Sequence, residues 1–425
     1  MTTRDLSRFA PDSKLAANTR DLCLDGFQGA VAAEPAESQP KWDPIRERGT
    51  TLWLDTGDIA AASKLWCREF DALTTNNTLL NKEVQKGIYD TFVPVAARAI
   101  RGADASIGER DLVLELAFCL NARHGLQLVQ TFGAKVSVEL HTDLADDLEA
   151  SVAYGRRYAA ICPDHFIVKV PLTAAGIIAA RRLSDDGIPV NFTLGFSARQ
   201  NLLVARLAKP EWCNVFMGRI NAFLADSGYG SGENAGERAT AASQKVCREL
   251  RAAGKSPTKQ IGASMRSYEQ VPALAGLDVY TMPLPVAEGW LAHGGDIGRG
   301  VDDDFPVTWS DGSDAKRDGL EVFWEVTPGE RAAIEAAAAV DVARLDADGL
   351  RAMLAERGCA NFFPTMHADE SKRISAEGKI PQNASWLADV RSGRLAWDTL
   401  LTLAGLASFS GDQEALDNRI RAQLS

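Results

Sequence analysis

The sequence lacks the cysteine and histidine spacings that mark zinc sites and redox motifs. Its seven cysteines are scattered with no Cys-x-x-Cys pair, and its five histidines are not at metal-ligand spacings. An odd number of unpatterned cysteines in a chain of 425 residues is typical of buried thiols in a reducing compartment. The acidic run Asp302–Asp304 has no second cluster of ligands, so we interpret it as a solvated loop. We therefore expect no metal site, no cofactor and a cytoplasmic location.

Long apolar runs, excess positive charge and a glycine-rich phosphate loop are also absent. No stretch of 18 or more apolar residues is present, and the polar segment Met1–Ala10 lacks the apolar core of a signal peptide. The net charge of −11 argues against binding to nucleic acid. A Gly-x-Gly-x-x-Gly fingerprint is missing, which disfavours an open dinucleotide-binding sheet. What remains is an ordinary globular chain, with 46% hydrophobic and 24% charged residues.

Short apolar runs alternate with helical patterns through the middle of the chain. Eight such runs are present, at 51–55, 72–75, 134–140, 166–170, 189–193, 214–218, 260–264 and 278–283. Strands that alternate with helices pair in parallel, and eight units of this length match a closed (β/α)₈ TIM barrel. We predict an N-terminal extension over residues 1–49, a catalytic barrel over 50–300 and a mostly helical extension over 301–425. The sequence leaves open whether this last part packs on the barrel or forms a separate domain.

Lys169 is the most informative residue, because it lies in the apolar strand pattern Phe166–Val170. An ammonium group there is costly to desolvate, which favours the neutral amine, and a neutral lysine can form a Schiff base with a carbonyl. A lysine that snorkels from a strand end is the alternative interpretation.

The other expected strands also end in polar residues, and the carboxyl ends of barrel strands carry the chemistry of this fold. The set comprises Asp55, Asn76, Asn77, Glu139, Asn191, Thr193, Arg219, Ser264 and Arg266. Each has a structural alternative: Asp55 as a helix cap, the two asparagines as turn residues, Glu139 as an exposed strand end and the arginines as surface charges. Together they form one chemical set, with an amine, two proton-transferring carboxylates, groups that bind hydroxyls and two guanidinium groups for a phosphate.

These segments resemble the transaldolase family between Leu52 and about Pro285. The matching pieces are Leu54-Asp55-Thr56, Thr74-Thr75-Asn76, Val136-Ser137-Val138-Glu139, Ile167-Val168-Lys169-Val170-Pro171, Gly187 to Leu194 with Phe196-Ser197, Phe216-Met217-Gly218-Arg219-Ile220 and Gly262-Ala263-Ser264-Met265-Arg266. The resemblance implies a metal-free, class I mechanism in which a dihydroxyacetone unit is transferred between sugar phosphates.

The resemblance also implies residue roles. Lys169 would form the Schiff base, Glu139 would act as acid and base through a water held by Thr193, and Asp55 would accept the substrate hydroxyl proton. Hydroxyl groups would be held by Asn76 and Asn191, the pocket would be lined by Phe216, and the phosphate would be bound by Arg219, Ser264 and Arg266.

Departures from the family pattern leave the substrates open. Asn77 replaces a usual proline, and Asn214, near the expected substrate site, replaces a usual serine. The related fructose-6-phosphate aldolases typically have Gln and Tyr in place of Glu139 and Phe216, which favours transfer over simple cleavage. A Schiff-base aldolase and a catalytically inactive barrel that binds sugar phosphates are the alternatives, and a homo-oligomer is a further expectation.

Overall fold

The structure of the protein is a computed structural model, and it describes residues 7–30 and 37–424. Eight parallel strands form a closed barrel in sequence order, and β8 pairs with β1 to close it. The strands are β1 (Thr51–Asp55), β2 (Phe70–Thr74), β3 (Lys135–Glu139), β4 (Phe166–Pro171), β5 (Val190–Thr193), β6 (Trp212–Phe216), β7 (Lys259–Ala263) and β8 (Val279–Pro283). The predicted (β/α)₈ barrel with a helical C-terminal extension is confirmed.

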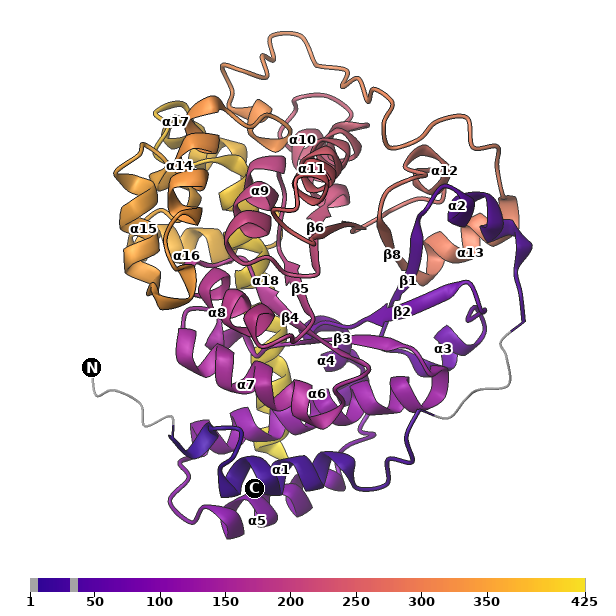
Figure 1. The fold of residues 1–425 in the computed structure, drawn as a ribbon, viewed down its shortest axis with the longest axis vertical. Helices are drawn as coiled ribbons and strands as arrows, with labels where there is room; N and C mark the ends of the chain where they lie inside the picture. Colours follow the sequence, from indigo (N-terminus) through magenta and orange to yellow (C-terminus); the bar gives the residue numbers. More distant parts are fainter. Residues whose placement is uncertain (1–6, 31–36, 425) are drawn as a thin grey trace.

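Helices lie between the strands and outside the barrel (Figure 1). Within the barrel region they are α3 (Ile59–Ser63), α4 (Asn77–Gln85), α5 (Phe92–Ala103), α6 (Glu109–Phe132), α7 (Leu148–Ile161), α8 (Ala174–Asp185), α9 (Ala198–Leu207), α10 (Met217–Asp226), α11 (Ala235–Ala252), α12 (Gln270–Ala273) and α13 (Leu284–His293). The long connection between β2 and β3 holds three of these helices, α4, α5 and α6. Gly87, whose φ of +81° is left-handed, lies just after the end of α4 and separates it from α5.

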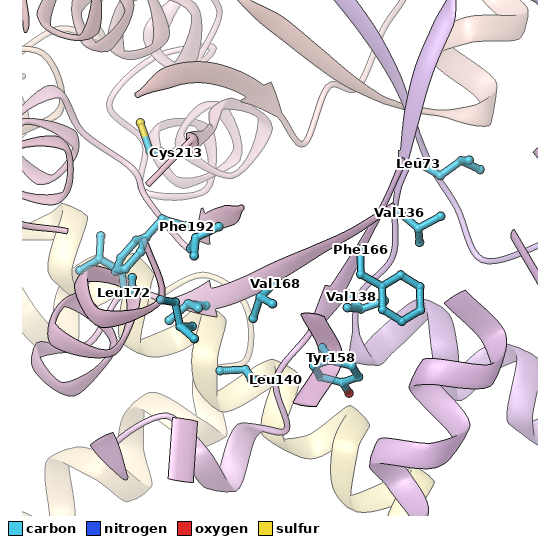
Figure 2. Close-up of a cluster of buried hydrophobic side chains, with 14 of the residues drawn as sticks. Leu73, Val136, Val138, Leu140, Tyr158, Phe166, Val168, Leu172, Phe192 and Cys213 are labelled. Carbon is cyan, nitrogen blue, oxygen red and sulfur yellow. The ribbon is translucent and has the colours of Figure 1, made fainter. Parts of the chain in front are cut away.

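The outer faces of the strands form one hydrophobic layer against the helices. Figure 2 shows Val136, Val138, Phe166 and Val168 on the side of the strands that faces Tyr158 of α7. Every second residue of a strand points to the same face, so the residues between these point into the barrel.

Inner-face residues of the strands belong to a second hydrophobic cluster, which continues into α10 and the C-terminal extension. Trp53 of β1 and Trp212 of β6 meet edge to face, with ring centroids 5.0 Å apart, although their strands are not neighbours. Ile167 belongs to the same cluster and lies two residues before Lys169. An apolar layer therefore closes the barrel below the residues at its carboxyl end.

Both extensions pack on the barrel. The N-terminal part contains α1 (Lys14–Leu24), which lies against α5 and α6, and α2 (Asp43–Glu47). The C-terminal part contains α14 (Pro328–Ala338), α15 (Ala347–Ala355), α16 (Ala368–Glu377), α17 (Asn383–Arg391) and α18 (Trp397–Ala422). In Figure 1, α14 to α17 lie together beside α9, and the long α18 extends away from them. No helix in the described part of the chain has the length and apolar character needed to cross a membrane.

A buried ion pair holds α18 against the barrel. Asp398, in the first turn of α18, accepts hydrogen bonds from Arg199 Nε and Nη2 of α9, each at 2.7 Å. At its other end α18 makes contacts with α4 and α6, and Arg419 pairs with Asp90. The extension is thus anchored on two sides of the barrel.

Candidate active site

The polar residues at the strand ends surround one cavity of about 280 Å³. Residues two apart on a strand point to the same face. Trp53 and Ile167 point into the barrel and form the apolar layer, so Asp55 and Lys169 also point inward and lie directly above it. Nine of the predicted site residues line the cavity: Asp55, Asn76, Lys169, Asn191, Asn214, Phe216, Arg219, Ser264 and Arg266. Of the other three, Glu139 and Thr193 are buried on β3 and β5, the strands on either side of β4, and Asn77 is buried at the start of α4.

Lys169 is buried, with 4% of its surface exposed, and it points into the barrel. Its Nζ donates a hydrogen bond to the carbonyl oxygen of Thr75 at 3.1 Å and lies 4.0 Å from Glu139 Oε2. Lys169 pairs with Glu139 of β3 on one side of β4 and with Asn191 of β5 on the other. The amine therefore lies at the centre of the polar set, within reach of a carboxyl group.

Burial and the charge of Lys169 act on both carboxyl groups. Burial raises the pKa of Asp55, and the charge of Lys169 and a hydrogen bond from Thr74 only partly oppose it. Burial also raises the pKa of Glu139, against the opposing effects of Lys169 and of the Asn77 amide, which donates to Oε2 at 3.1 Å. Carboxyl groups with raised pKa values can hold and release protons nearer to neutral pH, as general acid–base catalysis requires.

Asp55 does not cap a helix, which removes its structural alternative. The residue that caps α3 is Asp58, whose Oδ1 accepts from the amide of Ala61 at 2.9 Å. Asp55 instead accepts a hydrogen bond from Thr74 Oγ1 at 3.4 Å and faces the cavity.

The amide side chains of Asn76 and Asn191 differ in how far their hydrogen bonds are satisfied. Asn76 caps α4, because its Oδ1 accepts from the Leu79 amide at 2.8 Å, yet it also lines the cavity. Asn191 donates to Ser137 Oγ at 3.1 Å, but its Oδ1 is buried without a hydrogen-bond partner among the described residues. Thr193 Oγ1 is likewise buried and lacks a partner in that part of the chain. Unsatisfied buried oxygens cost stability, so they indicate that a ligand or water completes the site.

Asn77 and Asn214, the two departures from the family pattern, have different surroundings. The backbone of Asn77 supports Glu139, and its side chain donates to the carbonyl oxygen of Leu140 at 3.4 Å. Asn214 Oδ1 accepts from the Gly195 amide at 3.3 Å while the residue lines the cavity.

Arg219, Ser264 and Arg266 lie where β6 and β7 end. Strand β6 continues directly into α10 at Met217, so Arg219 belongs to the first turn of this helix, which carries no acidic residue. The amide groups of such a turn favour an anion. Burial, and next the charge of Arg266, lower the pKa of Arg219 to about 10, and the charges of Glu139 and Asp412 oppose this only in part.

Gly218 permits this close arrangement. A Cβ atom at residue 218 would lie 2.2 Å from the carbonyl oxygen of Ser264 and 2.7 Å from Cγ of Arg266. Ser264 itself has a left-handed φ of +60°, which is uncommon outside glycine and recurs at functional sites. The sequence pattern predicts a strand over 214–218, whereas β6 spans Trp212–Phe216. The strand ends earlier than predicted because Met217 and Gly218 already belong to α10.

Sequence reasoning missed several residues of the cavity. Thr281 follows the alternation of β8 and could have been found from its strand-end position. Lys82 lies on α4, while Lys379 and Phe409 come from the C-terminal extension, where the strand pattern gives no signal. The cavity thus contains three lysines and two arginines but one carboxylate, Asp55, among its lining residues. Within residues 7–30 and 37–424, no group of His, Cys, Asp and Glu is arranged to hold a metal ion.

Comparison with known proteins identifies relatives of this barrel. Residues 52–326 match the family model described as Transaldolase/Fructose-6-phosphate aldolase. A transaldolase of Xanthomonas campestris pv. campestris is 32% identical over 253 residues, which cover 58% of this chain and 76% of the relative. A probable transaldolase of Thermus thermophilus is 38% identical over 246 residues, which cover 57% of this chain and 91% of the relative.

Proposed function

This chain belongs to the transaldolase/fructose-6-phosphate aldolase family, and we propose that it transfers a dihydroxyacetone unit from a ketose phosphate to an aldose phosphate through a Schiff base on Lys169. The observation that carries the proposal is the position of the Lys169 amine, which is buried 4.0 Å from Glu139 and lies in a cavity that is also lined by Arg219 and Arg266.

The first half of the reaction forms and uses the Schiff base. Lys169 Nζ attacks the ketose carbonyl, and the resulting carbinolamine loses water to give an iminium ion, with Glu139 supplying the proton for the leaving hydroxyl group. The iminium withdraws electrons from the adjacent carbon–carbon bond, which breaks as Asp55 accepts the proton of the substrate hydroxyl. An aldose phosphate leaves, and the three-carbon unit remains on Lys169 as an enamine.

The second half reverses these steps with another aldehyde. The enamine carbon attacks the acceptor aldehyde, Asp55 returns its proton to the new hydroxyl group, and water releases the ketose from Lys169. The raised pKa values of Asp55 and Glu139 support these proton transfers. Neither carboxyl group needs a metal ion in this scheme, so the proposed mechanism is metal-independent.

The positive charge of the cavity supports phosphorylated substrates. Arg219 and Arg266 offer planar guanidinium groups that can bind a phosphate with paired hydrogen bonds, next to the first turn of α10. Lys82 and Lys379 add positive charge to the lining of the same cavity, which suits a phosphate on the acceptor as well as on the donor.

Reductive trapping tests the proposal. The protein is incubated with fructose 6-phosphate, reduced with borohydride and mapped by mass spectrometry, and the expected adduct lies on Lys169. Lys82 and Lys379 line the same cavity and serve as internal controls, since an adduct on either would contradict the assignment. Lys169→Ala should abolish both the adduct and turnover while the circular dichroism spectrum is retained.

A second measurement separates transfer from simple cleavage. With an aldose phosphate acceptor present, the proposed reaction forms a longer ketose phosphate, and without it little free dihydroxyacetone should appear. Multiple turnovers that release dihydroxyacetone in the absence of an acceptor would support the aldolase alternative. No adduct and no turnover, with phosphate still bound, would support a barrel that only binds sugar phosphates.

A further inference from the structure

The C-terminal extension reaches the anion-binding side of the cavity through α18. This helix lies outside residues 52–326, which match the family model. Phe409 of α18 is 5% exposed and lines the cavity. Four residues earlier, Gly405 lies so close to Arg219 that a Cβ atom there would be 2.9 Å from Nη1. One face of α18 is therefore packed directly on this arginine.

Arg219 is held by aromatic rings instead of by hydrogen-bonding partners. Its guanidinium carbon lies 5.2 Å from the ring centroid of Phe216 and 5.6 Å from that of Phe409. Arg219 is 7% exposed, and among the described residues its Nη1 has no hydrogen-bond partner, although the carboxylates of Glu139 and Asp412 act on its charge without forming a direct ion pair. Aromatic faces attract a guanidinium ion and restrict its plane without using its N–H groups. Those groups stay available for a bound anion.

The part of α18 that carries Phe409 is held on both sides. Thr402, seven residues earlier, donates to the carbonyl oxygen of Leu194 at 2.9 Å and accepts from Gln200 Nε2 at 3.1 Å. Asp412, three residues later, accepts a hydrogen bond from Thr78 of α4. Because α18 is tied to the loop after β5 and to α4, the segment that carries Phe409 cannot move away from Arg219 without breaking these contacts.

We propose that Phe409 is a positioning residue that orients Arg219 for the substrate phosphate, so that the C-terminal extension forms part of the substrate-binding site. The inference rests on the proposed function, since it assigns Arg219 to a phosphorylated substrate. It concerns binding of the phosphate and leaves the chemistry at Lys169 to the barrel.

The test compares phosphorylated and unphosphorylated ligands in substituted proteins. Phe409→Ala and Phe409→Leu remove the aromatic face, and Phe409→Tyr preserves it. Leu416→Ala is the matched control, because Leu416 is fully buried on the same helix and does not line the cavity. The readouts are the KM for the ketose phosphate, the Kd for inorganic phosphate by calorimetry and the trapping of dihydroxyacetone on Lys169 by borohydride.

We expect Phe409→Ala and Phe409→Leu to raise the KM and the phosphate Kd about tenfold, the effect of losing one desolvated cation–π contact. Trapping of dihydroxyacetone, which has no phosphate, should stay unchanged, and Phe409→Tyr and Leu416→Ala should keep both constants near those of the wild type. The inference is overturned if the phosphate Kd does not change in Phe409→Ala, or if Leu416→Ala raises it equally. Failure of the wild type to trap dihydroxyacetone would instead count against the proposed function, and calorimetry would still decide the role of Phe409.

Discussion

The buried ion pair between α9 and α18 offers a direct test of how the extension is attached. Arg199 is 1% exposed and Asp398 is 0% exposed. Besides its two hydrogen bonds to Asp398, Arg199 reaches Glu330 and Asn361 through Nη1, at 2.9 Å and 3.0 Å. Asp398→Ala removes the bidentate partner and leaves a guanidinium ion buried with one flanking carboxylate.

The expected loss is about 3 kcal/mol in the free energy of unfolding, at the lower end of the range for breaking a buried pair, because Glu330 remains. The same two parts of the chain provide a matched control. Arg206 lies seven residues along α9 and pairs with Glu335 of α14 at 2.7 Å, but the Glu335 side chain is 44% exposed. Glu335→Ala should therefore cost at most about 1 kcal/mol.

Urea unfolding followed by circular dichroism measures both losses. A double substitution, Arg199→Met with Asp398→Leu, should recover most of the stability, since it removes both charges together. Equal losses in Asp398→Ala and Glu335→Ala would refute the reasoning, because burial would then not determine the strength of the two pairs.

Two further predictions follow from the site. Because burial raises the pKa of Glu139, the folded protein keeps a proton that the unfolded chain releases above a pH of about 4.3, so this group lowers stability as pH rises. Glu139→Gln should therefore be more stable than the wild type by a margin that grows between pH 4 and 7 in urea unfolding, and a constant or shrinking margin would contradict the shift. Gly218→Ala should raise the KM for a phosphorylated donor at least tenfold, since the added Cβ would displace Ser264, whereas Gly102→Ala, with nothing within 4 Å, should leave steady-state kinetics unchanged.

The barrel could be predicted from the sequence because its strands combine apolar residues along their length with a polar residue at the carboxyl end. In β4 the outward residues are apolar, as Phe166 and Val168 show, and the inward series passes from Ile167 to Lys169. A polar residue at the end of such a run is costly unless it faces a site, so the same pattern indicates both the strand and the function. This local consistency explains why nine predicted residues meet in one cavity.

The contribution of the extension could not be predicted in this way. Phe409 and Gly405 contact Arg219, which lies almost two hundred residues earlier in the chain, and no local periodicity specifies that pairing. In addition, α18 packs against the barrel, α4, α6 and α16, so its apolar residues are spread around the helix and do not mark one face. Short-range pattern thus predicts that α18 is a helix but not what it covers.

The apolar layer inside the barrel determines how strongly the polar residues above it are desolvated. The apolar layer that contains Trp53, Ile167 and Trp212 excludes water from below, and α18 packs over part of the rim above. Desolvation raises the pKa values of Asp55 and Glu139, and it also lowers that of Arg219. Burial therefore disfavours the charged form of the carboxyl groups, and it also makes the charge of Arg219 costly. A bound phosphate would offset the cost of burying Arg219, so the anion site and the proton-transferring carboxyl groups both gain from the same enclosed cavity.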